Sequence, residues 1–327
     1  MGLRIAGTGM FVPERILTNA DLEKMVDTSD EWITTRTGIK ERRIADPEVA
    51  TSDLAYHAAL QALDMANTAP EELDLIVVAT TTPDRMFPNT ACLLQAKLGA
   101  GPCMSFDIEA ACSGLLYALD VGHALLKARP SYRRALVVGS EKLSAFTDWS
   151  DRNTCVLFGD GAGAMVLAQD DDSEGDFYLA SKLSADGRYA DILQMPAGGS
   201  ALPASAATVA ERQHYIRMGG SKTFQMAVAL MANTCSELLQ QTGTTPEQLR
   251  WLIPHQANER ILTAVATRLN MLDRVYVNIA RYGNTSAASI GLALDELNRA
   301  GEIKRGDLLL LTAFGGGLTW AAQLLRW

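Results

Sequence analysis

The sequence predicts a layered α/β fold made of two duplicated halves. Strands that are apolar on both faces, such as residues 73–80, alternate with amphipathic helices such as residues 51–67, and strands of this kind are typical of buried parallel sheets. An internal repeat is the second observation. Segments beginning near residues 68, 106 and 134 recur in the same order near residues 244, 277 and 306. Two such halves are expected to pack about a pseudo-twofold axis.

Composition excludes several classes of protein. The 327 residues are 48% hydrophobic and 20% charged, which fits a soluble globular protein with two domains or one large double-layered unit. The net charge of −9 argues against a nucleic-acid partner. No apolar run is long enough to span a membrane. The five cysteines form no C-x-x-C pair and no metal-ligand spacing, so we expect a reducing, cytoplasmic location and no metal.

The first half is predicted to contain strands and helices in alternation. The expected strands cover residues 3–12, 73–80, 104–108 and 134–139, and the expected helices cover residues 51–67, 89–97 and 112–127. A further helix begins near residues 28–32, where Ser or Asp caps a first turn that carries acidic residues. Trp32 and Arg36 share a face of that helix, which indicates either a surface helix anchored by its Trp or a platform that sandwiches a planar ring such as adenine.

The second half repeats this order from a boundary near residue 172. The acidic run at residues 169–176 marks that boundary, so we expect one half over residues 1–172 and the other over residues 173–327. A strand is expected at residues 250–254, a strand and helix from residue 277, and a last strand from residue 306. Residues 196–210, rich in Ala, Gly, Ser and Pro, indicate a loop or flap without chemistry of its own.

Cys112 lies where the strand at 104–108 gives way to a helix. Unpaired N–H groups and the positive end of the helix dipole favour a thiolate at such a position, so we expect a lowered pKa for this thiol. The alternative is a Cys that only fills the core, as most buried cysteines do. The repeat pairs Cys112 with Ser286, so the neighbouring Asn284 should face Cys112 across the pseudo-twofold axis.

His255 is the candidate partner among four histidines. It directly follows the strand at 250–254, at the carboxyl end where α/β sheets place their sites. We expect His57, His123 and His214 to be structural or surface residues.

Cys, His and Asn have two chemical interpretations. In a cysteine hydrolase, Asn orients His, and His deprotonates Cys. In a condensing enzyme, His and Asn both donate hydrogen bonds to one carbonyl oxygen and stabilise an enolate while Cys holds an acyl group. The duplication favours the second, because it places His and Asn on separate loops. The run Gly315-Gly316-Gly317 could supply a backbone N–H facing Cys112, or could be only a tight turn.

Several motifs together resemble β-ketoacyl-acyl-carrier-protein synthase III of the thiolase superfamily: AACSG, PHQAN, GNTSAAS, AFGGGLTW, DEWITTRTGI and FGDGAGA. The likeness runs almost from end to end of the chain. It implies a thiolase-like αβαβα fold and a decarboxylative Claisen condensation of an acyl-CoA primer with malonyl-acyl-carrier protein, which starts fatty acid synthesis. It also implies a homodimer and no cofactor beyond the coenzyme A thioester.

The resemblance assigns roles to individual residues. Cys112 would carry the acyl group, His255 and Asn284 would handle the malonyl half, and the N–H groups of Cys112 and Gly316 would form the oxyanion hole. The coenzyme A site would comprise Trp32 and Arg152 around the adenine, Arg36 and Thr37 near the nucleotide end, and Phe224 and Asn258 in the pantetheine channel. Phe87 would reach into the acyl pocket of the partner subunit.

Two positions depart from the family pattern, and they concern the surface near the channel. Ser221 stands where Asn is common, and Gln225 stands where Lys often meets the carrier protein. Lys222, Arg260 and Arg268 could still form the basic patch that an acidic carrier protein requires. Three alternatives remain at this point: a condensing enzyme or acyltransferase of specialised metabolism, a cysteine hydrolase, and a non-catalytic relative that binds coenzyme A. The sequence does not define the acyl primer.

Overall fold

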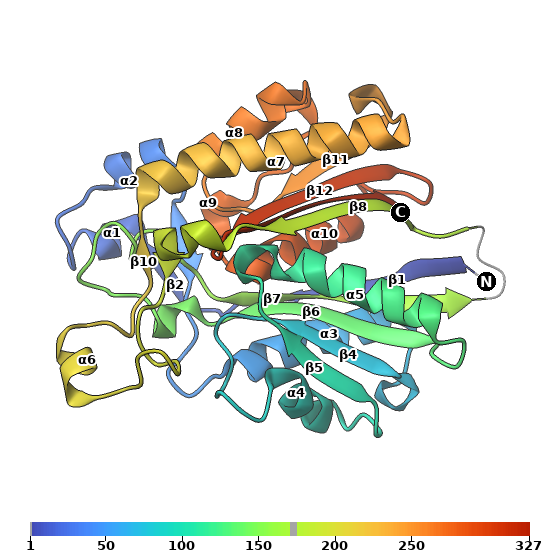
Figure 1. Cartoon of the computed structure of the whole chain (residues 1–327), viewed down its shortest axis with the longest axis horizontal. Coiled ribbons are helices and arrows are strands. Elements are labelled where there is room, and N and C mark those ends of the chain that lie inside the picture. The colour runs from blue at the N-terminus through green and yellow to red at the C-terminus, as the bar shows by residue number, and fades with distance from the viewer. Residues whose placement is uncertain (1, 171–174) are drawn as a thin grey trace.

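Two β-sheets alternate with three layers of helices, as the sequence predicts (Figure 1). The computed structural model describes residues 2–170 and 175–327. The first sheet has the order β1-β7-β6-β4-β5 and the second has the order β11-β12-β13-β8. In both, parallel strands (β4 with β6, β11 with β12) lie beside antiparallel ones. The α/β fold of two similar layers is therefore confirmed.

The strands of the first sheet are β1 (Gly2–Phe11), β4 (Leu75–Ala79), β5 (Met104–Ile108), β6 (Arg134–Glu141) and β7 (Gly161–Asp170). Those of the second are β8 (Tyr178–Ala185), β11 (Leu249–Pro254), β12 (Leu308–Gly315) and β13 (Thr319–Arg326). Strands β4, β6, β7 and β1 thus correspond to β11, β12, β13 and β8. The first sheet ends at residue 170 and β8 begins at residue 178; the predicted boundary near residue 172 lies outside the described residues.

Among the residues that the structure describes, the second sheet has no full counterpart of β5. The repeat predicts a strand near residue 277, but the chain there makes only one isolated parallel bridge, between Leu252 and Val275. The segment then turns into the short helix α9 (Ile279–Tyr282). The equivalence therefore fails at this edge of the second sheet.

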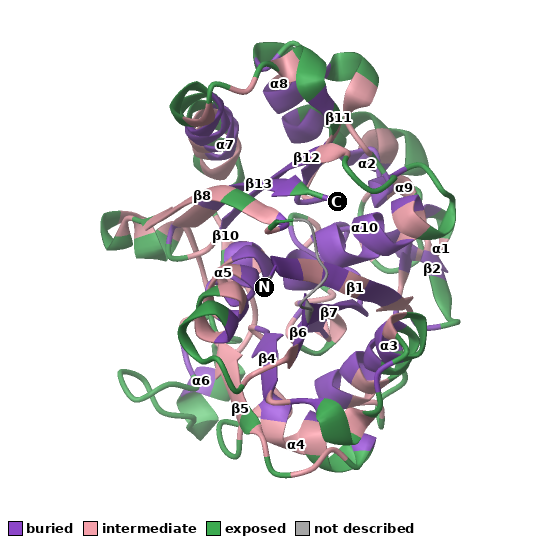
Figure 2. Cartoon of the chain, turned by 90° about the vertical axis from the view of Figure 1, so that its right-hand side faces the viewer, coloured by how far each residue is buried: buried purple, intermediate pink, exposed green. Residues whose placement is uncertain are grey.

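Six helices form the three helical layers. They are α3 (Thr51–Ala66) and α4 (Thr90–Leu98) outside the first sheet, α7 (Gly220–Thr242) and α8 (Glu259–Arg268) outside the second, and α5 (Gly114–Ala128) and α10 (Ser289–Arg299) between the sheets. Leu115, Leu116 and Leu119 of α5 and Ile290 and Leu294 of α10 belong to one buried cluster. Figure 2 shows these two central helices largely buried. Their apolar faces explain why they occupy the middle layer.

Two short 3-10 turns precede the central helices and meet near the pseudo-twofold axis. Ala111–Ser113 leads into α5, and Ser286–Ala288 leads into α10. The packing is reciprocal, because each turn lies against a strand of the other half. A Cβ on Gly315 of β12 would lie 2.6 Å from the backbone N of Cys112, and one on Gly139 of β6 would lie 2.3 Å from the carbonyl O of Ala287. Only glycine permits this approach.

The repeat is shifted by one residue at the nucleophile. Ala111 and Ser286 are both in the left-handed region at φ 47°, and each is the first residue of its 3-10 turn. Ser286 is therefore the structural counterpart of Ala111, and the counterpart of Cys112 is Ala287. The shift leaves Asn284 on the loop that meets the Cys112 turn.

The remaining elements are short and lie around one end of the layers. The strands are β2 (Ile16–Thr18), β3 (Glu41–Arg43), β9 (Leu193–Gln194) and β10 (Arg217–Met218), and the helices are α1 (Asn19–Leu22), α2 (Asp30–Thr37) and α6 (Ala206–Ala210). Further 3-10 turns cover Pro70–Glu72, Leu143–Ala145, Gly187–Ile192, Pro246–Gln248 and Leu272–Arg274.

The segment 196–210 is a loop only in part. Its last five residues form α6, which begins because the Ser205 hydroxyl accepts a hydrogen bond from the N–H of Thr208. The prediction of an unstructured flap is therefore wrong for residues 206–210. Within the described part of the chain, no helix combines the length and the apolar character needed to cross a membrane.

Candidate active site

Cys112, His255 and Asn284 line one cavity of about 760 Å³. Cys112 comes from the turn before α5, His255 follows β11, and Asn284 precedes the turn before α10. The cavity extends outward to α2 and to the start of α8. Nine of the predicted site residues line it: Trp32, Arg36, Thr37, Cys112, Phe224, His255, Asn258, Arg260 and Asn284.

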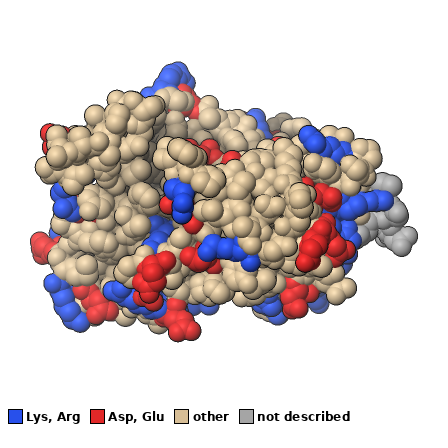
Figure 3. Space-filling model, turned by 90° about the horizontal axis from the view of Figure 1, so that it is seen from below, with Lys and Arg blue, Asp and Glu red and all other residues tan. Residues whose placement is uncertain are grey.

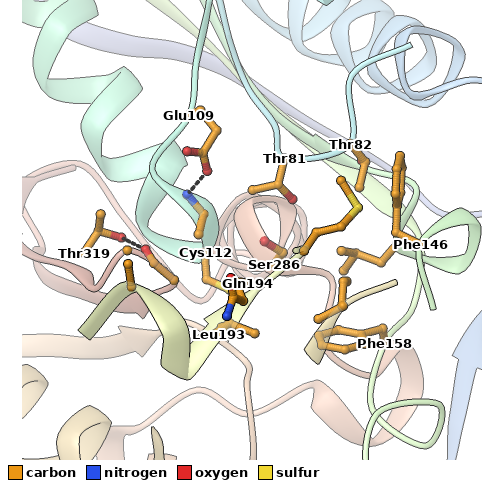
Figure 4. A pocket seen from close by; sticks show the side chains of 17 residues that line it. Thr81, Thr82, Glu109, Cys112, Phe146, Phe158, Leu193, Gln194, Ser286 and Thr319 are labelled. Carbon is orange, nitrogen blue, oxygen red and sulfur yellow. Dashed lines mark hydrogen bonds between the residues drawn. The ribbon is translucent and has the colours of Figure 1, made fainter. Parts of the chain in front are cut away.

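A second cavity of about 440 Å³ also reaches Cys112 (Figure 4). Its walls are largely apolar and include Leu143, Phe146, Phe158, Leu193 and Ile216. Gly316 lines this second cavity as well. The thiol therefore lies between a channel with both polar and apolar walls and a largely apolar chamber.

His255 is fixed by its backbone and by one ring nitrogen. Its backbone N–H donates to the carbonyl O of Thr312 at 2.8 Å, and this hydrogen bond continues the pairing of β11 with β12. The ring Nδ1 lies 2.7 Å from the hydroxyl of Ser289, and that hydroxyl also accepts from the N–H of Gln256 at 3.3 Å. Burial lowers the pKa of His255 to about 3, so the imidazole is neutral near pH 7.

Asn284 is held so that its amide nitrogen remains available. Its Oδ1 accepts the backbone N–H of Ser286 at 2.8 Å. Its own backbone pairs with Leu157 and Gly159. Because the carbonyl end is used in this way, the NH₂ end is the group that Asn284 can offer to a molecule in the cavity.

Burial raises the pKa of the Cys112 thiol to about 12, although the nearby Ser286 side chain lowers it in part. The prediction of a lowered pKa is therefore wrong. The helix end was expected to favour the thiolate, but the loss of hydration in this enclosed position has the larger effect. The thiol is therefore protonated in the free protein near pH 7.

Both arginines predicted beside Trp32 lie over its ring. The guanidinium carbon is 4.8 Å from the ring centroid for Arg36 and 4.4 Å for Arg152. Arg152 also pairs with Asp27 at 3.6 Å. A flat ring between Trp32 and Arg152 needs a separation of about 7 Å, twice the stacking distance. Arg152 must therefore move away before a base can lie there.

Thr37 and Asn258 have internal partners. The Thr37 hydroxyl donates to the carbonyl O of Ile33 at 2.6 Å and accepts from the N–H of Ile39 at 3.0 Å. Asn258 caps α8 through the N–H of Arg260 and donates to the carbonyl O of Arg36 at 3.0 Å. Asn258 thus ties α8 to α2 and shapes the channel mouth.

The predicted basic patch is split. Lys222 and Arg260 are exposed near the channel mouth, where they lie over Tyr189 and Phe224 at 4.9 and 5.5 Å. Arg268 is also exposed but is two helical turns further along α8, about 12 Å away. Ser221 and Gln225, where the sequence departs from the family pattern, line the channel.

The other predicted residues lie outside the cavities. Phe87 is 84% exposed in this single chain. His57 stacks on Phe11, His123 bonds to Asp176, and His214 bonds to Thr208.

In the chain outside residues 1 and 171–174, no group of three His, Cys, Asp or Glu is placed to hold a metal ion.

Two residues of the site were missed in the sequence. Ser289, the partner of His255, stands in the motif GNTSAAS, so its proximity to the site could have been inferred from the repeat. Glu141 ends β6 and is fully buried beside the thiol. Nothing in its sequence environment distinguishes it from a surface carboxylate at a strand end.

Comparisons with known proteins agree along the whole chain. The family model described as 3-oxoacyl-[acyl-carrier-protein] synthase III matches residues 106–187, and that of its C-terminal part matches residues 239–327. The chain is similar to a protein of Caldanaerobacter subterraneus subsp. tengcongensis named beta-ketoacyl-[acyl-carrier-protein] synthase III. The two are 55% identical over 99% of this chain and 97% of the relative.

Two solved structures illustrate the range of relatives. The 3-oxoacyl-[acyl-carrier-protein] synthase III of Aquifex aeolicus VF5 superimposes with a TM-score of 0.91 at 51% identity and covers 100% of both chains. A priming beta-ketosynthase from the R1128 polyketide biosynthetic pathway superimposes with a TM-score of 0.89 at 34% identity, covering 99% of this chain and 96% of the other.

Proposed function

This chain belongs to the 3-oxoacyl-[acyl-carrier-protein] synthase III family, and from that premise we propose that it condenses an acyl-CoA primer with malonyl-acyl-carrier protein. The products are 3-oxoacyl-carrier protein, CO₂ and coenzyme A. The reaction starts fatty acid synthesis and needs no cofactor beyond the coenzyme A thioester. The chain is an acyltransferase with a thiolase-like fold.

Cys112 takes the acyl group first. Its sulfur attacks the thioester carbonyl of acyl-CoA, a C–S bond forms, and the coenzyme A thiolate leaves. The N–H groups of Cys112 and Gly316 would hold the carbonyl oxygen as negative charge develops on it. The close approach of Gly315 to Cys112 supports this arrangement, because it places the end of β12 against the nucleophile turn. The acyl chain would extend into the apolar chamber.

His255 and Asn284 then act on the malonyl half. Loss of CO₂ leaves an enolate, whose oxygen would accept hydrogen bonds from both side chains, and the enolate carbon attacks the acyl-Cys112 carbonyl. Two donors aimed at one developing oxyanion are typical of such chemistry. The neutral imidazole suits this role, since its Nε2–H is a donor.

The observation that carries the proposal is how His255 is oriented. In a hydrolase of the papain type, the Asn would bind the His ring and the His would act as base for the Cys. Here Ser289 contacts Nδ1 at 2.7 Å, and the Oδ1 of Asn284 is bonded to Ser286. His255 and Asn284 are therefore two independent groups facing one cavity, which supports condensation over hydrolysis.

Coenzyme A would enter along the channel from α2. Trp32 and Arg152 would hold the adenine once Arg152 has moved, Arg36 and Thr37 would lie near the nucleotide end, and Phe224 and Asn258 would line the pantetheine arm. Lys222 and Arg260 flank the mouth, with Arg268 further along α8, and would attract an acidic carrier protein.

The chain is expected to act as a homodimer in the cytoplasm. Phe87 and Met86 are 84% and 79% exposed, which is unusual for neighbouring large apolar side chains, and β5 is an edge strand whose first residue, Met104, is exposed. Figure 3 shows broad uncharged areas on the lower side of the molecule. A partner subunit would cover these side chains and receive Phe87. The reactive thiol of Cys112 is suited to a reducing compartment.

A panel of acyl-CoA primers tests the proposal and defines the primer. Each is incubated with the enzyme alone, and intact mass is compared for wild type and Cys112→Ser; malonyl-carrier protein is then added and the product mass is read. We expect an adduct on wild type only, followed by a 3-oxoacyl product. No adduct with any primer would contradict the proposal. Preference for an unusual primer would instead favour a role in specialised metabolism, as in the polyketide priming relative.

A further inference from the structure

A carboxylate without a role in the mechanism above is buried beside the nucleophile. Glu141 is the last residue of β6 and has 0% exposure. A buried carboxylate is costly unless its charge is compensated. The partners of this one that we describe are all neutral, which distinguishes it from a structural ion pair.

Three consecutive threonines after β4 hold the carboxylate. The hydroxyl of Thr82 donates to Oε2 at 2.8 Å, and the hydroxyls of Thr80 and Thr81 do so at 3.2 and 3.1 Å. The backbone N–H of Thr81 donates to the same oxygen at 3.1 Å. These donors fix the group in one orientation behind the wall of the apolar chamber, which Thr81 and Thr82 line.

Ser286 connects this carboxylate with the thiol. It lines the apolar chamber together with Cys112, Thr81 and Thr82, and its side chain lies close enough to lower the pKa of both Cys112 and Glu141. Figure 4 shows Ser286 between Cys112 and Thr81 on the wall of the chamber. Ser286 is held there in the left-handed region at φ 47°, an unfavourable conformation for a residue with a side chain.

We propose that Glu141, acting through the hydroxyl of Ser286, accepts the proton that leaves the Cys112 thiol when the acyl group is transferred. This inference rests on the proposed function, because it concerns the first half-reaction of that site. Glu141 would thus act on the thiol only through Ser286, whose hydroxyl would contact the reacting sulfur.

The step balances without an added reactant. The S–H bond of Cys112 breaks as its sulfur forms a bond to the thioester carbon. The Ser286 hydroxyl takes this proton and passes its own to Oε of Glu141. The C–S bond to coenzyme A then breaks, and the departing thiolate takes a proton from solvent. When condensation later releases the Cys112 thiolate, Glu141 returns its proton by the same route.

The ionisation of Glu141 suits this task. Burial raises its pKa to about 7, against the lowering effect of its hydrogen bonds, and a base of that pKa is matched to neutral pH. His255 is the weaker base, because burial lowers its pKa to about 3. The carboxylate is thus the stronger of the two candidate bases.

The charged groups around Glu141 have other partners. Lys142, the next residue, bonds through Nζ to backbone carbonyls of residues 46–49. Asp160 bonds to Ala45 and Ser144. Glu109, on the other side of Cys112, bonds to the N–H of Ala111. The turn before α10, the end of β4 and the start of β7 present only neutral groups to it. Glu141 and Cys112 are therefore the titrating pair to follow.

The test is the rate of acyl transfer to Cys112 from acetyl-CoA, read as adduct mass, as a function of pH. We compare wild type with Glu141→Gln, Ser286→Ala and the control Asp160→Asn, which changes another fully buried carboxylate. We expect the wild-type rate to rise with pH and level off above about 7. Glu141→Gln and Ser286→Ala should lose this inflection and fall by roughly 100-fold. Asp160→Asn should keep it.

The acylation rates of the variants distinguish a proton relay from a purely electrostatic role of Glu141, and from failure of the proposed function. An ionised Glu141 near the thiol also raises the thiol pKa, so a purely electrostatic role predicts faster acylation of Glu141→Gln. Faster or unchanged acylation, or an inflection that persists, overturns the relay. Ser286→Ala keeps Glu141 and its threonines, so its rate decides the matter if Glu141→Gln does not fold. If wild type forms no adduct, the proposed function itself fails.

Discussion

The hydroxyl of Ser289 lies 2.7 Å from Nδ1 of His255. Because the same hydroxyl accepts the N–H of Gln256, its proton is free to be donated to Nδ1. The ring then carries its own proton on Nε2, which faces the cavity as a donor. The contact therefore fixes both the direction and the tautomer of His255, as condensation requires.

Replacing Ser289 with Ala should slow condensation about tenfold, because one buried hydrogen bond that orients the imidazole is lost. Acyl transfer to Cys112 should change little. The measurement is the rate of each half-reaction, with Ser236→Ala as control, because the Ser236 hydroxyl donates to the carbonyl O of Ala232 within α7, away from the site. An equal loss in both half-reactions would contradict the assignment.

Replacing Asn284 with Ala should spare acyl transfer and reduce condensation by roughly 100-fold or more, the effect of removing one oxyanion donor. The amide nitrogen is the available end of this side chain, since Oδ1 is bonded to Ser286. Rapid-quench assays of adduct and product measure the two steps. Retained condensation would show that Asn284 has another role.

Replacing Arg152 with Ala should lower kcat/KM about tenfold for acetyl-CoA and leave it unchanged for acetyl-pantetheine, which has no adenine. The reason is the stacking position of Arg152 over Trp32. Arg250→Ala is the matched control, because Arg250 also lies over a Trp ring, that of Trp251 in β11, and neither residue lines the two cavities. Equal losses for both substrates would place Arg152 elsewhere in the mechanism.

Stability should depend on pH through Glu141. Its folded pKa is about 7 against a usual 4.5, so the folded protein retains a proton that the unfolded chain has lost between these values. The stabilising contribution is complete below pH 4.5 and is lost as pH rises through 7. The free energy of unfolding of wild type minus that of Glu141→Gln should therefore fall by about 3 kcal/mol across this range. Denaturant titrations at several pH values measure it, and a constant difference would contradict the raised pKa.

Much of the architecture was predictable, because hydrophobic periodicity indicates each helix and strand and the internal repeat indicates that the two halves have the same order of elements. The strand at 104–108 and the helix beginning at 51 agree with the structure. The repeat correctly predicted that Asn284 lies near Cys112. The structural equivalence is shifted by one residue from the predicted one, and α9 stands before the second turn where β5 stands before the first. The absence of a fifth strand from the second sheet was not predictable. The residues near 277 have the apolar pattern of a strand, but the structure pairs this segment with β11 only through the bridge between Leu252 and Val275.

The properties of the site were harder to predict than its members. The pKa of Cys112 depends on how completely the two halves enclose it, which no local pattern records. Ser289 acts through a contact between α10 and the end of β11, and Glu141 contacts the threonines that follow the neighbouring strand β4. Spacing correctly placed Arg36 beside Trp32, but Arg152 comes from a distant segment and lies equally close. Only the resemblance to the family indicated it.

The most direct test of the account is the fate of a labelled acyl group on Cys112. The enzyme is acylated with isotopically labelled acetyl-CoA, separated from free coenzyme A, and mixed with malonyl-carrier protein. We predict that the label leaves the protein in 3-oxoacyl-carrier protein, with release of one CO₂ per label. Release of the label as free acetate at the same rate with or without malonyl-carrier protein would contradict the account and indicate a hydrolase.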